Sequence, residues 1–216
     1  MIKKNECKIC SRETVLLWDE EFKLDYYVCN YCEYICCDEA AIVPPEQELI
    51  RYQQHNNTLE NEGYVNMFKD FMEITVDPYA SRIKTALDFG SGPTPVLATL
   101  LRQKGYDVDI YDLYFAPEKV YENKRYDLIT ATEVFEHLQD PLQTASLLKN
   151  HLNDQGILAI MTMFHPGDAD SFNNWWYRHD ATHISFYRPK TFKVMAELLG
   201  LTVLTFDHKN VCVLTK

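Results

Sequence analysis

Residues 87–95 constrain the fold more than any other segment, because they join a strand pattern to a helix pattern through a glycine turn. Thr85–Phe89 has the length and apolar character of a buried strand. Beyond the turn, apolar side chains recur at helical spacing, with Thr94 suited to the N-cap and Pro95 to the first helical position. Strand and helix patterns keep alternating over residues 85–216, which predicts an α/β fold with a mostly parallel sheet.

The glycines of this turn allow a ligand to approach the backbone closely, but the pattern is a poor one for a dinucleotide. Gly90 and Gly92 provide the conformational freedom. A dinucleotide turn also needs a third glycine, which packs helix on strand and seats pyrophosphate at the helix N-terminus. Here a Pro-Thr-Pro run follows, and Asp88 opens the turn. An acidic side chain repels phosphate, so it favours a ligand with cationic groups and no phosphate.

Asp88, Gly90 and Gly92 match the first motif of the class I S-adenosylmethionine (SAM)-dependent methyltransferases, Asp/Glu-x-Gly-x-Gly-x-Gly, and the chain resembles that family here. Thr94 replaces the last glycine of the motif. SAM carries sulfonium and ammonium charges and no phosphate, in agreement with the acidic turn. The resemblance implies the class I methyltransferase fold, a Rossmann-like sheet flanked by helices, with SAM as cofactor.

An acidic residue after the next predicted strand supports a nucleoside site. Residues 108–112 form that strand, and Asp112 lies 22 residues after Gly90. A carboxylate at this distance can accept hydrogen bonds from the ribose hydroxyls; the alternative is a surface aspartate that closes the strand. Leu113 follows directly, and it either covers one face of the adenine or belongs to the core.

Composition sets the expected compartment and partners. With 216 residues, 46% of them hydrophobic, the chain is long enough for one α/β domain and a small additional module. No stretch approaches the roughly 18 apolar residues of a membrane span, and the first residues lack the apolar run of a secretory signal. We therefore expect a cytoplasmic protein without a membrane partner. The net charge of −11 argues against a nucleic-acid partner, and nothing in the sequence specifies an oligomeric state.

Four cysteines near the N-terminus have the spacing of a zinc site. Cys7-x2-Cys10 and Cys29-x2-Cys32 are separated by 18 residues, a spacing at which two short turns bring four thiolates to one metal. Disulfide pairing is the alternative, but a chain without an export signal belongs in a reducing compartment. Four thiolates close the coordination sphere, so we expect a structural Zn²⁺ that supplies much of the folding free energy of a zinc-ribbon-like module over residues 1–43.

The role of this module is less constrained than its chemistry. Residues 1–43 contain five basic and nine acidic side chains, so we expect a scaffold, a dimer contact or a wall of the substrate pocket rather than a nucleic-acid site. Cys36 and Cys37 are alternative ligands, but the second Cys-x2-Cys pair is better placed. Cys212 is expected in the core.

Residues 44–84 are expected to form connecting helices that open at Pro44. An apolar stripe over residues 63–74 is fit to pack on the sheet. Residues 51–57 before it are dense in hydrogen-bonding side chains, which indicates either a solvated helix face or a lid. The family resemblance implies N-terminal lid helices, and Tyr64 is then expected to contact the methionine end of SAM.

A second motif follows the strand expected at residues 126–131. Glu133 and His137 lie in the sequence Thr-Glu-Val-Phe-Glu-His-Leu, which resembles the fourth motif of small-molecule class I methyltransferases, Glu-x-x-Glu-His. Because this loop lies beside the crevice where open α/β sheets bind ligands, we expect Glu133 to contact the cofactor. His137 either faces the transferred methyl group or bonds to backbone. The chain before Tyr126 has little room for a third strand, so the family pattern is trimmed there.

Residues 165–187 carry many aromatic side chains for a loop, which indicates that they cover something. They resemble the Trp-Tyr-x-x-Asp-x-Thr-His-x-x-Phe-Tyr segment of a bacterial methyltransferase group, in a match that begins at His55-Asn56-Asn57. A sulfonium is a strong electrophile, but a hydroxyl acceptor also needs a base, or else these histidines only fix the loop. The candidates are His183 first, then His179 and His165, with Asp180 as the orienting carboxylate and His137 across the site.

These features predict SAM-dependent methyl transfer to a small-molecule acceptor. An RNA or protein methyltransferase is one alternative, and the acidic balance counts against RNA. A non-catalytic SAM-binding protein or a zinc-mediated assembly protein is another. The expected organisation is a zinc-ribbon-like module over residues 1–43, connecting or lid helices over residues 44–84, and a SAM-binding methyltransferase domain over residues 85–216.

Overall fold

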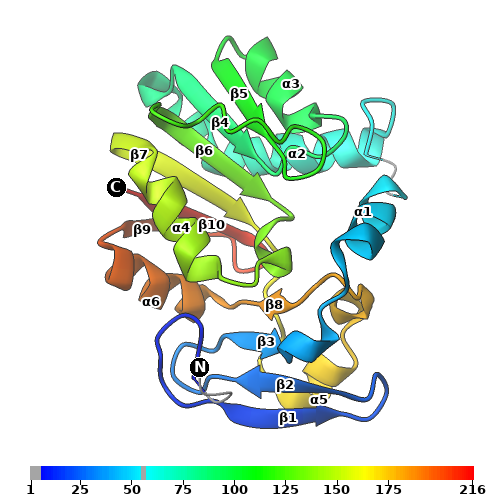
Figure 1. Cartoon of the computed structure of the whole chain (residues 1–216). Coiled ribbons are helices and arrows are strands. Elements are labelled where there is room, and N and C mark those ends of the chain that lie inside the picture. The colour runs from blue at the N-terminus through cyan, green and yellow to red at the C-terminus, as the bar shows by residue number, and fades with distance from the viewer. Residues whose placement is uncertain (1–5, 55–56) are drawn as a thin grey trace.

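The computed structural model describes residues 6–54 and 57–216, which form two β-sheets (Figure 1). The larger sheet has six strands in the order β5-β4-β6-β7-β10-β9. Neighbouring strands from β5 to β7 are parallel, and β10 is antiparallel to both of its neighbours. The expected mostly parallel sheet is confirmed. The strands are β4 (Thr85–Phe89), β5 (Asp107–Tyr111), β6 (Tyr126–Thr132), β7 (Leu152–Met161), β9 (Thr202–Phe206) and β10 (Val211–Thr215).

Successive side chains of the central strands point to opposite faces of the sheet and are buried on both, which explains why helices cover both faces. Leu128 of β6 packs into the core that α2 and α3 share with the sheet, whereas its neighbour Ile129 packs into the core on the side of α4 and α6. Cys212 is buried in β10, as expected. The sheet is therefore the middle of three layers (Figure 1). The helices are α2 (Glu62–Thr75), α3 (Val96–Gln103), α4 (Pro141–Asn150) and α6 (Pro189–Leu199).

The chain between β5 and β6 is shortened, as the sequence predicted. It forms turns and one isolated bridge between Asp112 and Ala116, so β5 is an edge strand of the sheet. The predicted start of α3 was wrong by one residue. Pro95 is the N-cap, without a side-chain cap, and the amide of Val96 donates to the carbonyl of Thr94 at 2.8 Å, which adds a tight turn before the helix.

The smaller sheet combines the cysteine-rich N-terminus with a strand from the other end of the chain. Its order is β1-β2-β3-β8, and β8 pairs with β3 through Ile35 opposite Phe186. Much of the aromatic segment packs here, because Phe172, Tyr177 and Phe186 share a core with Tyr26 of β2. The elements are β1 (Val15–Asp19), β2 (Leu24–Val28), β3 (Ile35–Cys37), β8 (Ser185–Phe186) and the short helix α5 (Ala169–Asn173).

Helix α1 (Pro45–Gln53) stands at one side between the two sheets (Figure 1). Arg51 connects it to the aromatic segment through Asp180, and Glu48 connects it to Tyr114 beyond β5. His55 and Asn56 of the predicted lid segment lie outside the described residues. None of the helices over residues 6–54 and 57–216 has both the length and the hydropathy that crossing a bilayer requires.

Candidate functional site

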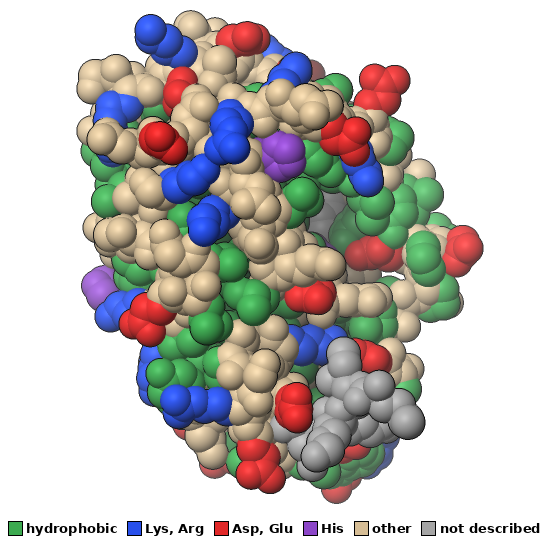
Figure 2. Space-filling model, turned by 60° about the vertical axis from the view of Figure 1, so that its left-hand side comes forward, with side chains coloured by type: hydrophobic (Ala, Val, Ile, Leu, Met, Phe, Trp, Pro, Cys, Tyr) green, Lys and Arg blue, Asp and Glu red, His purple; other side chains and the backbone are tan. Residues whose placement is uncertain are grey.

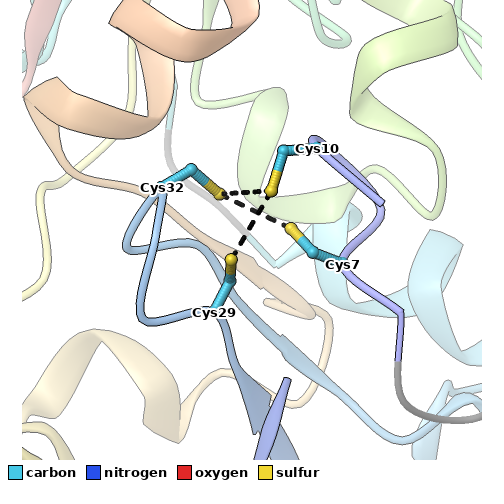
Figure 3. A group of neighbouring side chains, drawn as sticks. All are labelled: Cys7, Cys10, Cys29 and Cys32. Atoms are coloured by element: carbon cyan, nitrogen blue, oxygen red, sulfur yellow. Dashed lines mark hydrogen bonds between the residues drawn. The ribbon is translucent and has the colours of Figure 1, made fainter. Parts of the chain in front are cut away.

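The two Cys-x2-Cys turns share one backbone geometry and bring their four sulfurs together (Figure 3). In each turn, the residue after the second cysteine has a positive φ, +56° at Ser11 and +62° at Glu33. Its amide donates to the carbonyl of the first cysteine, at 2.9 and 2.8 Å respectively. Three of the Sγ–Sγ distances are 3.5 Å for Cys7 and Cys32, 3.6 Å for Cys10 and Cys29, and 3.7 Å for Cys10 and Cys32.

These separations fit a tetrahedral metal and not a disulfide. Zn–S bonds of about 2.3 Å place the sulfurs of a tetrahedron about 3.8 Å apart. A disulfide would bring two sulfurs to about 2.05 Å, and every cysteine from residue 6 onward in the described chain is a free thiol. Cys36 and Cys37, the alternative ligands, are buried in β3 and do not belong to the cluster. The four predicted residues are thus the ones that fit Zn²⁺.

The second cysteine turn is bonded to the segment after β7 and to the start of α6. The ring of His165 donates through Nε2 to the carbonyl of Glu33 at 2.7 Å, and the Glu33 carboxylate pairs with Arg188 at 3.2 Å. The Thr191 hydroxyl donates to the carbonyl of Cys32 at 2.9 Å. Burial lowers the pKa of His165 to about 4. His165 therefore acts in the structure as a contact to the cysteine turn.

Both glycines of the turn after β4 have backbone conformations that other residues rarely adopt. Gly90 has φ +83° and Gly92 has φ +67°. A Cβ at Gly90 would lie 2.2 Å from Cγ2 of Val134, so the turn packs directly against the loop after β6. A Cβ at Gly92 would meet no heavy atom within 4 Å. Open space beside Gly92 is where a ligand can approach the backbone.

Asp112 ties the loop after β4 to the loop after β5. Its Oδ2 accepts the amide of Gly92 at 2.8 Å, and its Oδ1 accepts the amides of Tyr114 and Phe115 at 2.9 and 3.0 Å. A carboxylate offers about four acceptor positions, so one remains on Oδ2. The next residue, Leu113, is 64% exposed, so it does not belong to the core.

Asp88 at the end of β4 and Glu133 just after β6 both act electrostatically on Tyr64 of α2. Asp88 is buried at the end of β4 and accepts the Thr130 hydroxyl at 2.9 Å. Burial raises the pKa of Asp88 to about 6, and the negative charge of Asp112 acts in the same direction. Burial and the charges of Asp88 and Glu133 raise the pKa of the Tyr64 hydroxyl. Figure 2 shows a hollow on one face of the molecule, bordered by hydrophobic and acidic side chains.

Beyond the glycine turn, two carboxylates share one tyrosine. The Tyr177 hydroxyl lies 2.5 Å from Oε1 of Glu136 and 3.0 Å from Oε2 of Glu133. Glu136 is 0% exposed, and its Oε2 has no hydrogen-bond partner among the described residues. Burial raises the pKa of both carboxyl groups, and the charge of Glu136 raises that of Glu133 further. Glu133 itself has φ +53°, a strained conformation typical of functional sites.

Sequence reasoning did not single out Glu136 or Tyr177. The signals were present, because Glu136 is the second glutamate of Glu-x-x-Glu-His and Tyr177 belongs to the aromatic segment. What the sequence does not contain is their proximity, which arises where the loop after β6 meets the segment before β8.

His137 and His183 meet in the same place, with ring centroids 4.8 Å apart. Nδ1 of His137 lies 3.0 Å from the carbonyl of Thr182, and Nδ1 of His183 lies 2.7 Å from the carbonyl of Tyr177. A carbonyl only accepts, so each Nδ1 carries the proton and each Nε2 keeps a lone pair. Burial lowers the pKa of both rings, that of His183 to about 3, so both are neutral.

The other two predicted catalytic residues have different partners. Asp180 accepts the Thr182 hydroxyl and Nε of Arg51, both at 2.7 Å. Burial alone would raise the pKa of Asp180, but these hydrogen bonds hold it well below its usual range. His179 is exposed and packs edge-on against Phe22, at 5.4 Å between ring centroids.

Helix α1 covers the histidine pair from one side. The ring of Tyr52 packs edge-on against His137 at 5.1 Å, and the Tyr52 hydroxyl donates to Glu48 at 2.6 Å. Tyr114, which follows Leu113, donates to the same glutamate. The loop after β5 and the histidine pair are therefore joined through α1.

Comparison with known proteins identifies the family to which the chain belongs. A family model described as a methyltransferase domain matches residues 65–205, well over half of the chain. A search of curated proteins finds no relative of the sequence. Similar solved structures include a SAM-dependent methyltransferase from Archaeoglobus fulgidus, with a TM-score of 0.54 and 15% identity over 70% of this chain and 94% of that one.

Two further structures are longer than this chain. The mitomycin 7-O-methyltransferase MmcR has a TM-score of 0.57 and 12% identity, covering 80% of this chain and 58% of its own. An O-methyltransferase family protein from Burkholderia thailandensis has a TM-score of 0.50 and 13% identity, covering 78% of this chain and 62% of its own. This chain thus spans less than two thirds of either, and at these identities the likeness is one of fold. Strand order and family model agree: the chain belongs to the methyltransferase-domain family and has the class I methyltransferase fold.

Proposed function

We propose that this enzyme transfers a methyl group from SAM to a small-molecule acceptor. The observation that carries the cofactor proposal is the pair of loops after β4 and β5. Gly90 and Gly92 have positive φ, open space lies beside Gly92, and the Asp112 carboxylate fixes the Gly92 amide while keeping one acceptor position. A ribose hydroxyl suits that position.

The remaining cofactor residues are assigned by charge and position. SAM, when bound, supplies a methyl group on a cationic sulfur and carries an ammonium group. Asp88 and Glu133 provide negative charge for these two cations, and Tyr64 lies where both carboxylates influence its hydroxyl. We assign Tyr64 to the methionine end and the exposed Leu113 to the adenine.

Calorimetry of SAM binding tests the ribose assignment. Loss of a hydrogen bond to a charged group costs about 1.5–3 kcal/mol, so Asp112→Ala should weaken SAM binding by about 10- to 100-fold or more. Asp109→Ala is the matched control, because Asp109 lies on β5 just before Asp112 but pairs with Lys124 and Tyr126. Unchanged affinity in Asp112→Ala would refute the assignment.

A ligand change separates the ribose contact from the anchoring of the loop. Removing the ribose hydroxyls of S-adenosylhomocysteine should weaken its binding to the wild-type enzyme. In Asp112→Ala the same removal should have little further effect, because the partner carboxylate is already gone. Additive losses would mean that Asp112 only anchors the loop.

On the acceptor side, we place the acceptor's nucleophilic group beside His137 and His183, whose Nδ1 atoms are both held by backbone carbonyls. Asp180 and His179 then hold the loop, Asp180 to α1 through Arg51 and His179 to the β1–β2 turn through Phe22. A small molecule is favoured over RNA because a chain of net charge −11 repels a polyanion.

Labelled-methyl SAM identifies the acceptor class. Incubated with cell extract that is then split into metabolite, protein and RNA fractions, the enzyme should place the label in the metabolite fraction. Label in the protein or RNA fraction would replace the small-molecule proposal. SAM binding without label in any fraction would favour a non-catalytic SAM-binding or zinc-mediated assembly protein.

For the N-terminus, we propose a structural Zn²⁺ on Cys7, Cys10, Cys29 and Cys32, in a cytoplasmic protein whose thiols stay reduced. The proposed division keeps residues 1–43 as the zinc module, residues 44–84 as connecting and lid helices, and residues 85–216 as the methyltransferase domain. Strand β8 of the methyltransferase domain then pairs with β3 and completes the sheet of the zinc module. The zinc module serves as the scaffold for the segment that carries Tyr177 and His183.

A further inference from the structure

A second group of metal-ligating side chains lies apart from the four cysteines, on the acceptor side. Glu136, His137 and His183 each offer one ligand atom, and these atoms all lie within 4.8 Å of one another. Glu136 and His137 belong to the 3-10 turn Phe135–His137 after β6, and His183 lies shortly before β8. Two imidazoles and one carboxylate form a donor set that binds divalent first-row metals.

Both histidines are held as metal ligands usually are. A ligating imidazole typically donates its other ring N–H to a carbonyl or carboxylate, which fixes the ring and leaves one lone pair for the metal. Here Nδ1 of His137 is held by the carbonyl of Thr182, and Nδ1 of His183 by that of Tyr177. Because a carbonyl only accepts, each ring keeps its lone pair on Nε2.

The carboxylates of this cluster need a positive partner. Glu136 is 0% exposed with Oε2 unpaired in the described chain, and the Tyr177 hydroxyl has one proton for Glu136 and Glu133 together. Glu48 adds further negative charge beside His137. Arg51 is the cation that acts on His183, but its Nε is taken by Asp180. A buried carboxylate with one unpaired oxygen and no cation beside it is costly, and a divalent cation would offset that cost.

We infer that Glu136, His137 and His183 bind one divalent transition-metal cation. The binding site stands on this geometry, and only the cation's role rests on the proposed function. That role is to bind a hydroxyl group of the acceptor and lower its pKa. The O–H bond then breaks with its electron pair staying on oxygen, and the proton passes to solvent.

Titration with Mn²⁺ tests the site without involving the cysteines, because Mn²⁺ prefers carboxylate and other oxygen ligands, whereas thiolates suit Zn²⁺. The protein is stripped with chelator, reloaded with one equivalent of Zn²⁺ and titrated while the electron paramagnetic resonance signal of free Mn²⁺ is recorded. Wild type should bind one Mn²⁺ per chain. His183→Ala and Glu136→Gln should weaken binding by at least tenfold, as loss of a ligand exceeds the roughly 10- to 100-fold effect of second-shell changes.

His151→Ala is the matched control, because Nδ1 of His151 also lies 3.0 Å from a backbone carbonyl, that of Lys124, at the end of α4. It should bind Mn²⁺ like wild type. Absence of stoichiometric Mn²⁺ in wild type overturns the inference even if a variant fails to fold, and so does equal binding by wild type and a folded His183→Ala.

SAM calorimetry on the same samples separates this inference from the proposed function. Wild type that binds Mn²⁺ but not SAM would leave the metal site standing and remove the methyl-transfer proposal. Wild type that binds SAM but not Mn²⁺ would remove the metal site and leave the methyl-transfer proposal standing. His183→Ala that binds SAM normally and has lost Mn²⁺ supports both.

Discussion

Replacing Gly90 by alanine probes the contact between the first motif and the loop after β6. The new Cβ would lie 2.2 Å from Cγ2 of Val134, and φ at this position is +83°. Left-handed backbone costs an L-residue about 1–2 kcal/mol. Forcing a methyl group into a packed site costs a further 1–3 kcal/mol or so. Gly90→Ala should therefore destabilise the protein by about 2–5 kcal/mol.

Gly92→Ala is the control, because Gly92 also has a positive φ but open space where its Cβ would stand. Gly92→Ala should therefore cost only about 1–2 kcal/mol, from holding an L-residue in a left-handed conformation. For a chain of this size, 1 kcal/mol shifts the melting temperature by roughly 2–4 °C. We expect scanning calorimetry to give a loss of about 5 °C for Gly92→Ala and about 10 °C for Gly90→Ala.

Val134→Ala should rescue Gly90→Ala in part, since it removes the methyl group that the new Cβ meets. The double-mutant cycle should give a favourable coupling of about 1–3 kcal/mol, while Gly92→Ala and Val134→Ala should be additive. Equal destabilisation by the two glycine variants, or no coupling between positions 90 and 134, would refute the packing argument.

Three further predictions follow from the site and its supports. The Asp88 carboxyl has a pKa of about 6, so it becomes neutral as the pH falls through 6, and SAM affinity should drop about tenfold between pH 7.5 and 5.0. Calorimetry of Asp88→Asn should give weak binding without that pH dependence, and a wild-type affinity independent of pH would count against Asp88. Cys29→Ser should lose one equivalent of zinc by elemental analysis, whereas Cys37→Ser should keep it; zinc retained by Cys29→Ser would exclude the four-cysteine site. Arg178 and Asp19 form an ion pair with side chains 1% and 2% exposed, so Arg178→Met should cost about 3–5 kcal/mol in urea unfolding. Lys104→Met, in a pair with Asp77 that is 36% and 43% exposed, should cost about 1 kcal/mol or less, and equal costs would contradict the role of burial.

Features that depend on neighbouring residues could be read from the sequence. The strand, turn and helix around Gly90 follow from apolar periodicity and from backbone freedom. Helix α6 likewise begins at Pro189 and ends before Gly200, which has a left-handed conformation. The two cysteine turns likewise follow from spacing, because each is closed by a hydrogen bond within five residues.

Contacts between distant segments required the tertiary structure. Glu136 and Tyr177 are 41 residues apart, and Tyr34 and Ser185, whose hydroxyl groups lie 2.7 Å apart, are separated by 151. The density of aromatic side chains in residues 165–187 indicated only that they cover something. The structure shows that much of this segment packs on the smaller sheet, because β8 completes that sheet beside β3.

The candidate histidines show most clearly what local sequence decides and what packing decides. Their residue types marked His137, His179 and His183 as candidates, but only packing decides which rings meet. His179 turns outward to Phe22, whereas His137 and His183 face each other because backbone carbonyls of the aromatic segment hold both Nδ1 atoms. Sequence by itself determined the fold class, the pairing of the two cysteine turns and the glycine turn after β4, since these depend on local spacing. The tertiary structure alone decided which carboxylates and imidazoles share one buried site, since that depends on how two loops far apart in the chain pack together.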